Sequence, residues 1–317
     1  MKKLVLLLGA LSLVSAAAYA KEVVPAVEEV AVVEEVQAAP MLRVTSVGQA
    51  LEFDNTSGSS DIGETVFFRN YVNLAYGDNW TFGLMAAKMW DMDTDDGIHS
   101  KDHRIELDAW RHFDNFSLGL KWRGQEDYDR YYLRGKYSYG MFSGWADVAY
   151  QSNNGADDSE DAYYVEAIPL AVTVGPVTLG YYFEADTWAV NDKEDGFEHW
   201  YRQQLRISAP IYSGEKLNVG LEYRWQFDTD AEYDKDRRAI WKEGDLNPGE
   251  KPRTLGWDEV DTNHIVVLSA NYALTESLVI DGYYQYEFRE YDRKGDDAKD
   301  KDDNYYGEFY VGWTYTF

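Results

Sequence analysis

The sequence lacks several features that would place it in common classes of protein. It contains no cysteine, so disulfide bonds cannot stabilise an exported chain of this size. Its net charge is −27, which argues against a nucleic-acid partner because nucleic acids bind basic surfaces. After residues 1–20 no apolar stretch approaches the roughly 18 residues of a transmembrane helix, which excludes such a helix from the rest of the chain.

What is present at the N-terminus indicates export. Residues 1–20 read MKKLVLLLGALSLVSAAAYA, with two lysines, an apolar run and a small-residue A-x-A site. This is the pattern of a secretory signal peptide, and we expect cleavage after Ala20. The apolar run is too short to span a bilayer as a helix, so a retained anchor is the less favoured alternative.

Residues 21–40 differ in composition from the rest of the chain. They are rich in Val, Glu and Ala, contain two prolines and no aromatic residue, and include the sequence VEEV twice. We predict a flexible periplasmic linker here, with a short docking or self-associating helix as the alternative.

Residues 41–317 alternate between patterned runs and two kinds of connection. Short connections of tight-turn residues, such as Gly175-Pro176, take turns with longer and mostly acidic ones. The long set lies at about 54–63, 93–101, 124–129, 153–160, 191–197, 229–259 and 292–303. This predicts an all-β fold, a transmembrane antiparallel up-and-down β-barrel of about 14 strands (12–16), with short periplasmic turns and longer extracellular loops. A soluble β-sandwich, the alternative, has no reason to sort its loops by length.

Side chains alternate with period two inside these runs. In FSLGLKWR, residues 116–123, apolar residues alternate with small or charged ones, which predicts a strand with one apolar face. About fourteen strands enclose a lumen too wide for side chains to fill dry. We therefore expect the charged side chains to face water inside the barrel and the apolar side chains to face lipid.

The alternation assigns two sets of charged side chains to this lumen. The basic set comprises Arg104, Lys121, Arg123, Arg130, Arg134, Lys136, Arg202, Arg206 and Arg224. The acidic set comprises Glu106, Asp108, Glu184, Asp186, Glu222, Asp281, Glu287 and Glu308. Two interpretations stay open: a transverse field between a basic and an acidic wall, or ordinary solvated charges that pair across strands. A pore of this kind needs no catalytic residue, metal ion or cofactor, and we predict none.

The two ends of the chain resemble those of known outer-membrane proteins. The last residues, GEFYVGWTYTF, place Trp313, Tyr315 and Phe317 on one face. This pattern resembles the signal that bacterial outer-membrane proteins present to the barrel-assembly machinery. The first residues, MKKLVLLLGALSLVSAAAYAKEVVPA, are similar to the start of the fusobacterial major outer-membrane porins.

This resemblance carries expectations about location, function and partners. It implies a bacterial outer-membrane location and a general diffusion porin that can assemble as a homotrimer. Its partners would be outer-membrane lipids, lipopolysaccharide and small hydrophilic solutes. The chain is also similar in outline to oligogalacturonate-specific porins, which implies a porin for acidic oligosaccharides as an alternative.

Two functions of other classes stay open. An outer-membrane enzyme would need a Ser–His or His–Asp pair near one rim. His99, Asp102 and His103 lie near the expected outer rim, but no family motif surrounds them, and we predict that the chain is not an enzyme. A non-conducting adhesin or structural barrel would be smaller and plugged, whereas about fourteen strands favour a pore.

Overall fold

The computed structural model describes residues 41–56, 65–93, 97–154, 161–188, 197–233, 260–291 and 305–317. The expected signal peptide and linker, and most of the expected long connections, lie outside these ranges. Among the described residues no helix is long and apolar enough to cross a membrane.

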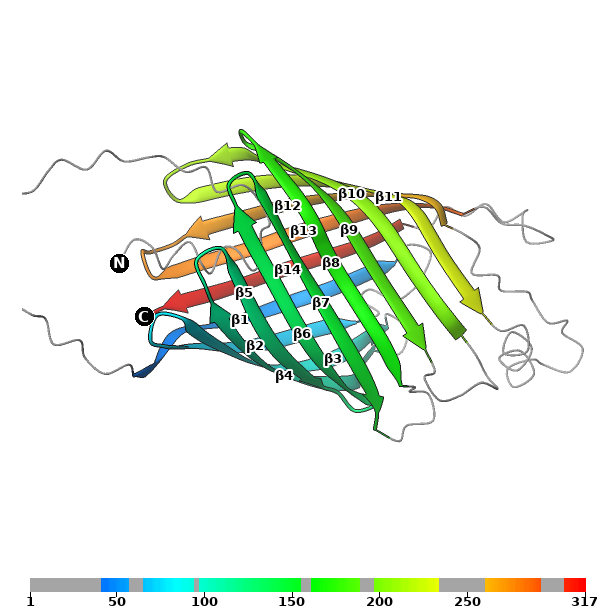
Figure 1. The fold of residues 1–317 in the computed structure, drawn as a ribbon, viewed down its shortest axis with the longest axis horizontal. Coiled ribbons are helices and arrows are strands. Elements are labelled where there is room, and N and C mark those ends of the chain that lie inside the picture. The colour runs from blue at the N-terminus through cyan, green and yellow to red at the C-terminus, as the bar shows by residue number, and fades with distance from the viewer. Residues whose placement is uncertain are drawn as a thin grey trace, which may run out of the picture.

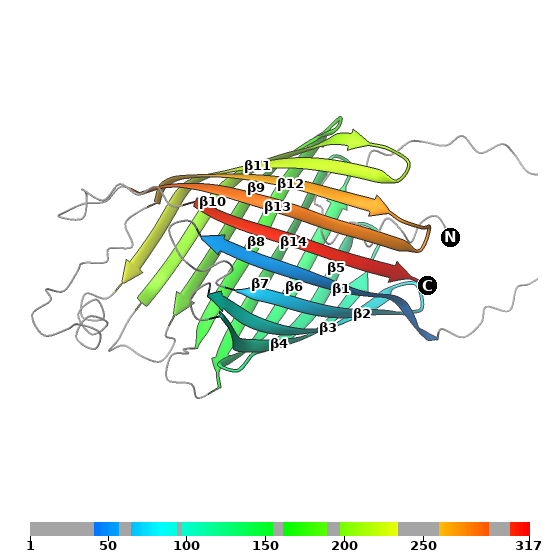
Figure 2. The ribbon, with the colours of Figure 1, turned by 180° about the vertical axis from the view of Figure 1, so that it is seen from behind.

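The described chain consists of fourteen antiparallel strands. They are β1 (Leu42–Thr56), β2 (Val66–Tyr76), β3 (Trp80–Asp93), β4 (Gly97–His112), β5 (Phe116–Gly124), β6 (Tyr128–Tyr139), β7 (Phe142–Asn153), β8 (Ala162–Val174), β9 (Val177–Trp188), β10 (Phe197–Ser213), β11 (Leu217–Tyr233), β12 (Val260–Ala273), β13 (Leu278–Tyr291) and β14 (Tyr305–Thr316). Each strand pairs with its neighbours in sequence, and β14 pairs with β1, so the sheet closes. The predicted all-β, up-and-down barrel of about fourteen strands is confirmed. Figure 1 shows β6 to β9 in front, and Figure 2 shows β12 to β14 and β1 in front.

Six short connections lie at one end of the barrel, and the β5–β6 connection at the other end, expected to be longer at 124–129, is also only three residues. The six join β2–β3, β4–β5, β6–β7, β8–β9, β10–β11 and β12–β13, and each contains two to four residues. Gly140 and Gly175 begin the two-residue turns with φ of 59° each, a left-handed conformation that glycine adopts without steric cost. The amide of Phe317 donates to the carbonyl of Thr45 at 3.0 Å, so the C-terminus lies at this same end (Figure 1).

At the opposite end the strands are longer than the sequence indicated. β4 begins at Gly97, so residues 97–101 are strand although we expected a connection there. Likewise β1 runs to Thr56 and β11 runs to Tyr233, which corrects the expected connections at 54–63 and 229–259. The reason is that ladder hydrogen bonds join backbone groups, so acidic and polar residues continue a strand once its neighbour offers a partner.

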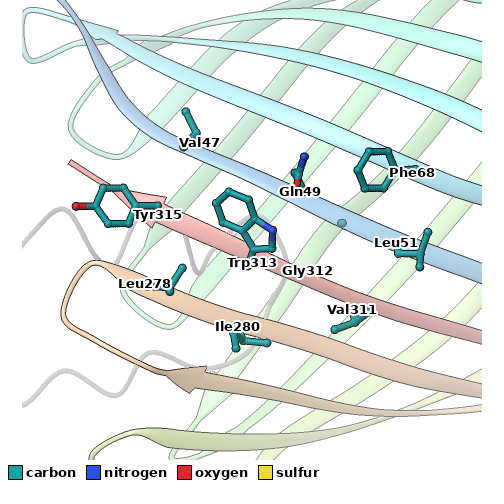
Figure 3. Close-up of a pocket in the computed structure, with 11 residues that line it drawn as sticks. Val47, Gln49, Leu51, Phe68, Leu278, Ile280, Val311, Gly312, Trp313 and Tyr315 are labelled. Atoms are coloured by element: carbon teal, nitrogen blue, oxygen red, sulfur yellow. The ribbon is translucent and has the colours of Figure 1, made fainter.

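The two faces of the sheet differ in composition. On β5 the side chains of Phe116, Leu118 and Leu120 are 47%, 50% and 64% exposed, whereas Ser117 between them is buried. Exposed large hydrophobic side chains occur on all fourteen strands. Around the seam between β1 and β14, such side chains line a shallow apolar groove, drawn in Figure 3.

Candidate functional site

The face opposite the exposed apolar side chains is the inner face of the barrel. Side chains from strands that are not neighbours meet on it, and this requires a concave surface. Arg134 of β6 contacts Asp108 of β4 across β5. The Arg224 guanidinium of β11 donates to Gln285 of β13 at 3.0 Å across β12.

Strand alternation and contacts place all of the predicted lumen residues on this inner face. On β4, for example, Arg104, Glu106 and Asp108 alternate with the outward side chains of Ile105 and Leu107. The first basic group lies on β4, β5 and β6, and the second lies on β10 and β11. Each group has carboxylates close to it.

In the first group, acidic side chains lie among the basic ones. Arg134 contacts Asp108, and its Nε lies 3.0 Å from the carboxylate of Asp147 on β7. The Nε of Arg123 donates to Glu106 at 2.6 Å. The inner wall here is therefore a mixture of both signs rather than a purely basic surface.

A second cluster joins β8, β9 and β10. Glu166 and Glu184 lie directly opposite each other across the β8–β9 ladder, an arrangement that is unfavourable for two carboxylates. The Tyr164 hydroxyl lies 2.8 Å from Glu166 and 2.9 Å from Glu184, and the Tyr182 hydroxyl lies 3.1 and 2.5 Å from the same two groups. Arg202 contacts Glu184 from β10. The phenol donors and the guanidinium offset the repulsion.

A third cluster spans the seam that closes the barrel. Arg69 of β2 lies 2.5 Å from Glu52 of β1. The Tyr283 hydroxyl of β13 contacts Glu308 of β14 and lies 3.3 Å from Glu52. These polar contacts cross the β1–β14 junction on its inner side, and the apolar groove runs along its outer side.

Several inner-wall residues were not predicted. Glu52, Arg69, Asp147 and Glu166 follow the same alternation as the predicted charges, so this signal was available for them. The tyrosines and glutamines that contact the charges carry no charge, and sequence alone did not distinguish them from other polar residues.

Two of the histidines with described side chains, His112 and His103, lie close to hydroxyl or carboxyl groups. The two ring nitrogens of His112 lie 2.7 Å from the Thr81 hydroxyl and 3.0 Å from the Ser117 hydroxyl. Ser117 is only 7% exposed, which would hide a nucleophile from substrate. His103 lies at the other rim, 3.8 Å from Asp102.

One group of side chains near the outer rim has donor atoms close enough for a metal ion. Ligand atoms of Asp102, His103 and Glu126 lie within 4.8 Å of one another. The Asp102 carboxylate already accepts hydrogen bonds from the His103 and Glu126 backbone amides and from the Gln125 side chain. These bonds account for its position without a metal ion.

No protein-family model and no curated protein matches the chain. Solved structures of similar shape include OccD3 (OpdP) of Pseudomonas aeruginosa, an anion-selective porin from Comamonas acidovorans and the outer-membrane channel DcaP of Acinetobacter baumannii. Their sequence identities to this chain are 10%, 12% and 11%, and their TM-scores are 0.46, 0.41 and 0.42. The matches cover 87%, 88% and 89% of this chain and 91%, 100% and 98% of theirs. At this level of similarity they assign no function, and the fold rests on the strand pairing.

Proposed function

We propose that the chain is a bacterial outer-membrane porin, a barrel with a water-filled channel for passive diffusion of small hydrophilic solutes and ions. The observation that carries this proposal is the distribution of side chains over the two faces of a closed sheet. Apolar side chains are exposed outside, and charged side chains gather inside.

The outer face suits a lipid bilayer. A continuous apolar surface around a whole barrel is unfavourable in water, whereas a closed sheet leaves no backbone group unpaired in lipid. Aromatic side chains are exposed near the short-turn end, where Phe113 and Phe116 stack with ring centroids 4.4 Å apart. Such rings favour the membrane–water interface.

The inner face suits an aqueous channel. Arginines and carboxylates retain part of their exposure there, with Arg202 at 40% and Arg224 at 22%. Ion pairs of this kind cost little when water solvates the remaining charge, and much when water is absent. Water inside the barrel would therefore stabilise this wall.

The expectations about export, assembly and partners belong to this proposal. Cleavage after Ala20 would release the mature chain, and the barrel-assembly machinery would recognise the C-terminal strand. Trp313, Tyr315 and Phe317 are 37%, 40% and 70% exposed, which leaves them accessible to such a partner. Lipopolysaccharide, phospholipids and further copies in a homotrimer would contact the same outer wall.

A liposome-swelling assay tests the proposal. Vesicles that contain the refolded mature chain are diluted into isotonic solutions of neutral sugars of increasing size. We expect swelling rates that fall steadily with solute size. Vesicles that contain a folded, heat-modifiable barrel and do not swell in any sugar would contradict a pore and favour an adhesin or structural barrel.

A further inference from the structure

The inner arginines are held in two different ways. Arg134 and Arg202 contact carboxylates directly. In contrast, the Nε of Arg104 donates to the side-chain oxygen of Gln125 at 2.9 Å, and Arg130 donates twice to that of Gln151, at 3.1 and 2.5 Å. A neutral amide orients a guanidinium without neutralising it, so these arginines keep their full charge.

The amide-held arginines lie next to a like charge. Arg123 and Arg130 are directly opposite each other across the β5–β6 ladder, and like charges in this position destabilise a sheet. Glu106 lies directly opposite Arg123 across the β4–β5 ladder, and Arg104 is two residues from Glu106 on the same face of β4, so Arg104 is a diagonal neighbour of Arg123. Three guanidinium groups therefore converge on one region of the inner wall.

Few carboxylates contact these cations directly. Glu106 binds Arg123 at 2.6 Å and lies 3.8 Å from the Lys121 ammonium. Asp186 approaches Arg130 only to 4.0 Å. With Lys121 included, only two carboxylates among the described residues lie within 4.0 Å of any of these four cations. Asp102 reaches Arg104 only through the Gln125 amide, and Glu166 and Glu184 reach Arg130 only through the Tyr164 side chain. Within the described part of the chain, Arg104 contacts no carboxylate.

Aromatic rings support the three guanidinium groups. The guanidinium carbons of Arg104, Arg130 and Arg123 lie 4.9, 4.5 and 5.5 Å from the ring centroids of Phe67, Tyr164 and Tyr132, respectively. A ring that stacks on the flat face of a guanidinium leaves the N–H donors at its edge available. Hydrogen bonds to Gln125 and Glu106 use only the Nε atoms of Arg104 and Arg123.

We propose that Arg104, Arg123 and Arg130 form a binding site inside the channel for the carboxylate or phosphate group of a small anionic solute. The inference rests on the proposed function, because it requires an open lumen. The forked donors of arginine match two oxygens of such a group. A bound oxyanion would also offset the repulsion between the three guanidinium groups. The positive charge of this site would make the channel favour anions.

A second like-charge pair has the same construction. Arg206 and Arg224 are directly opposite each other across the β10–β11 ladder. The Nε of Arg206 donates to Gln204 at 2.9 Å, and its guanidinium carbon lies 3.5 Å from the ring centroid of Tyr182. An anion that leaves the first site would meet a second of similar chemistry.

The chain's net charge of −27 does not oppose this inference. Charges act on a permeating ion only within a Debye length of about 8 Å at physiological salt. Many of the acidic residues belong to the connections and not to the strands. The arginine donors that no carboxylate occupies therefore give the channel its preference for anions.

The test compares two variants in planar bilayers. Arg104→Gln/Arg130→Gln removes two charges that are held mainly by amides, so the fold should be retained. Arg111→Gln is the control, because Arg111 lies on β4 but faces outward over the Trp80 ring. Reversal potentials are recorded in a KCl gradient, and chloride current is titrated with inorganic phosphate and, separately, with succinate.

We expect an anion-selective reversal potential and block by phosphate or succinate in the unmodified chain and in the Arg111→Gln control. A unit charge about 5 Å from an anion in water changes local anion concentration about fourfold. The double variant should therefore raise the half-blocking concentration more than tenfold. Two results would overturn the inference and leave the porin proposal intact. One is an open channel that favours cations. The other is a double variant that phosphate and succinate block at the same concentrations as the unmodified chain. A folded barrel without conductance would instead contradict the porin proposal.

Discussion

Replacing Arg134 with methionine would show how strongly the inner ion pairs stabilise the barrel. Arg134 lies between the carboxylates of Asp108 and Asp147, and the three side chains are 16%, 20% and 9% exposed. Removing one partner of a fully buried ion pair costs about 3–5 kcal/mol because a charge is left uncompensated. Since water reaches this wall and two carboxylates lose one partner, we expect a loss of about 2–4 kcal/mol.

The free energy of unfolding can be measured by urea titration of the refolded barrel in lipid vesicles, with tryptophan fluorescence as the signal. The triple variant that adds Asp108→Asn and Asp147→Asn should recover most of the loss, because the two carboxylates that contacted Arg134 are then neutral. Arg111→Met removes an outward arginine and should cost less than about 1 kcal/mol. If Arg134→Met destabilised the barrel no more than Arg111→Met, the inner ion pairs would have no structural role.

Three further changes test other parts of the structure. Leu120→Arg places a charge on the outward face at the middle of β5 and should cost about 2–4 kcal/mol in the same titration, whereas no loss would contradict a lipid-facing wall. Gly119→Ala would bring a Cβ to 2.7 Å from the Trp110 ring, so we expect the ring to be displaced. The near-ultraviolet circular dichroism spectrum should change, and the free energy of unfolding should fall by about 1–3 kcal/mol. An unchanged spectrum would refute this packing. Deletion of Phe317 should reduce the amount of heat-modifiable barrel in the membrane fraction of cells without reducing the yield of refolding into detergent. An equal reduction of both quantities would indicate an effect on stability instead of on assembly.

The fold was predictable because two independent patterns agreed. Period two in runs such as 116–123 indicated strands with one apolar face, and the alternation of short and long connections indicated their order. Strand ends were less predictable. Gly97 and Tyr233 mark strand limits that depend on pairing with a neighbouring strand, and side-chain hydropathy does not report that pairing.

The charged side chains of the inner wall were predictable in position but not in their contacts. Alternation is a property of one strand, so it placed Arg123 and Arg130 on the inner face. That they lie directly opposite each other follows from the register between β5 and β6, which the sequence pattern does not contain. The roles of Gln125 and Gln151 depend on the same registers.

A pair of glycine-to-cysteine variants tests the central proposal most directly. The chain has no cysteine, and an added Cβ at Gly83 would meet only the inner side chains of Asp108 and Asn73 at 3.4–3.5 Å. At Gly135 it would meet only the outward side chain of Leu118 at 3.9 Å, so both positions have room for a side chain.

Single-channel currents would be recorded in planar bilayers before and after addition of a charged, water-soluble thiol reagent. We predict stepwise conductance proportional to salt concentration, and a smaller step after modification of Gly83→Cys but not of Gly135→Cys. A folded barrel that never conducts, or a step that shrinks only when Gly135→Cys is modified, would contradict an aqueous channel lined by the charged face.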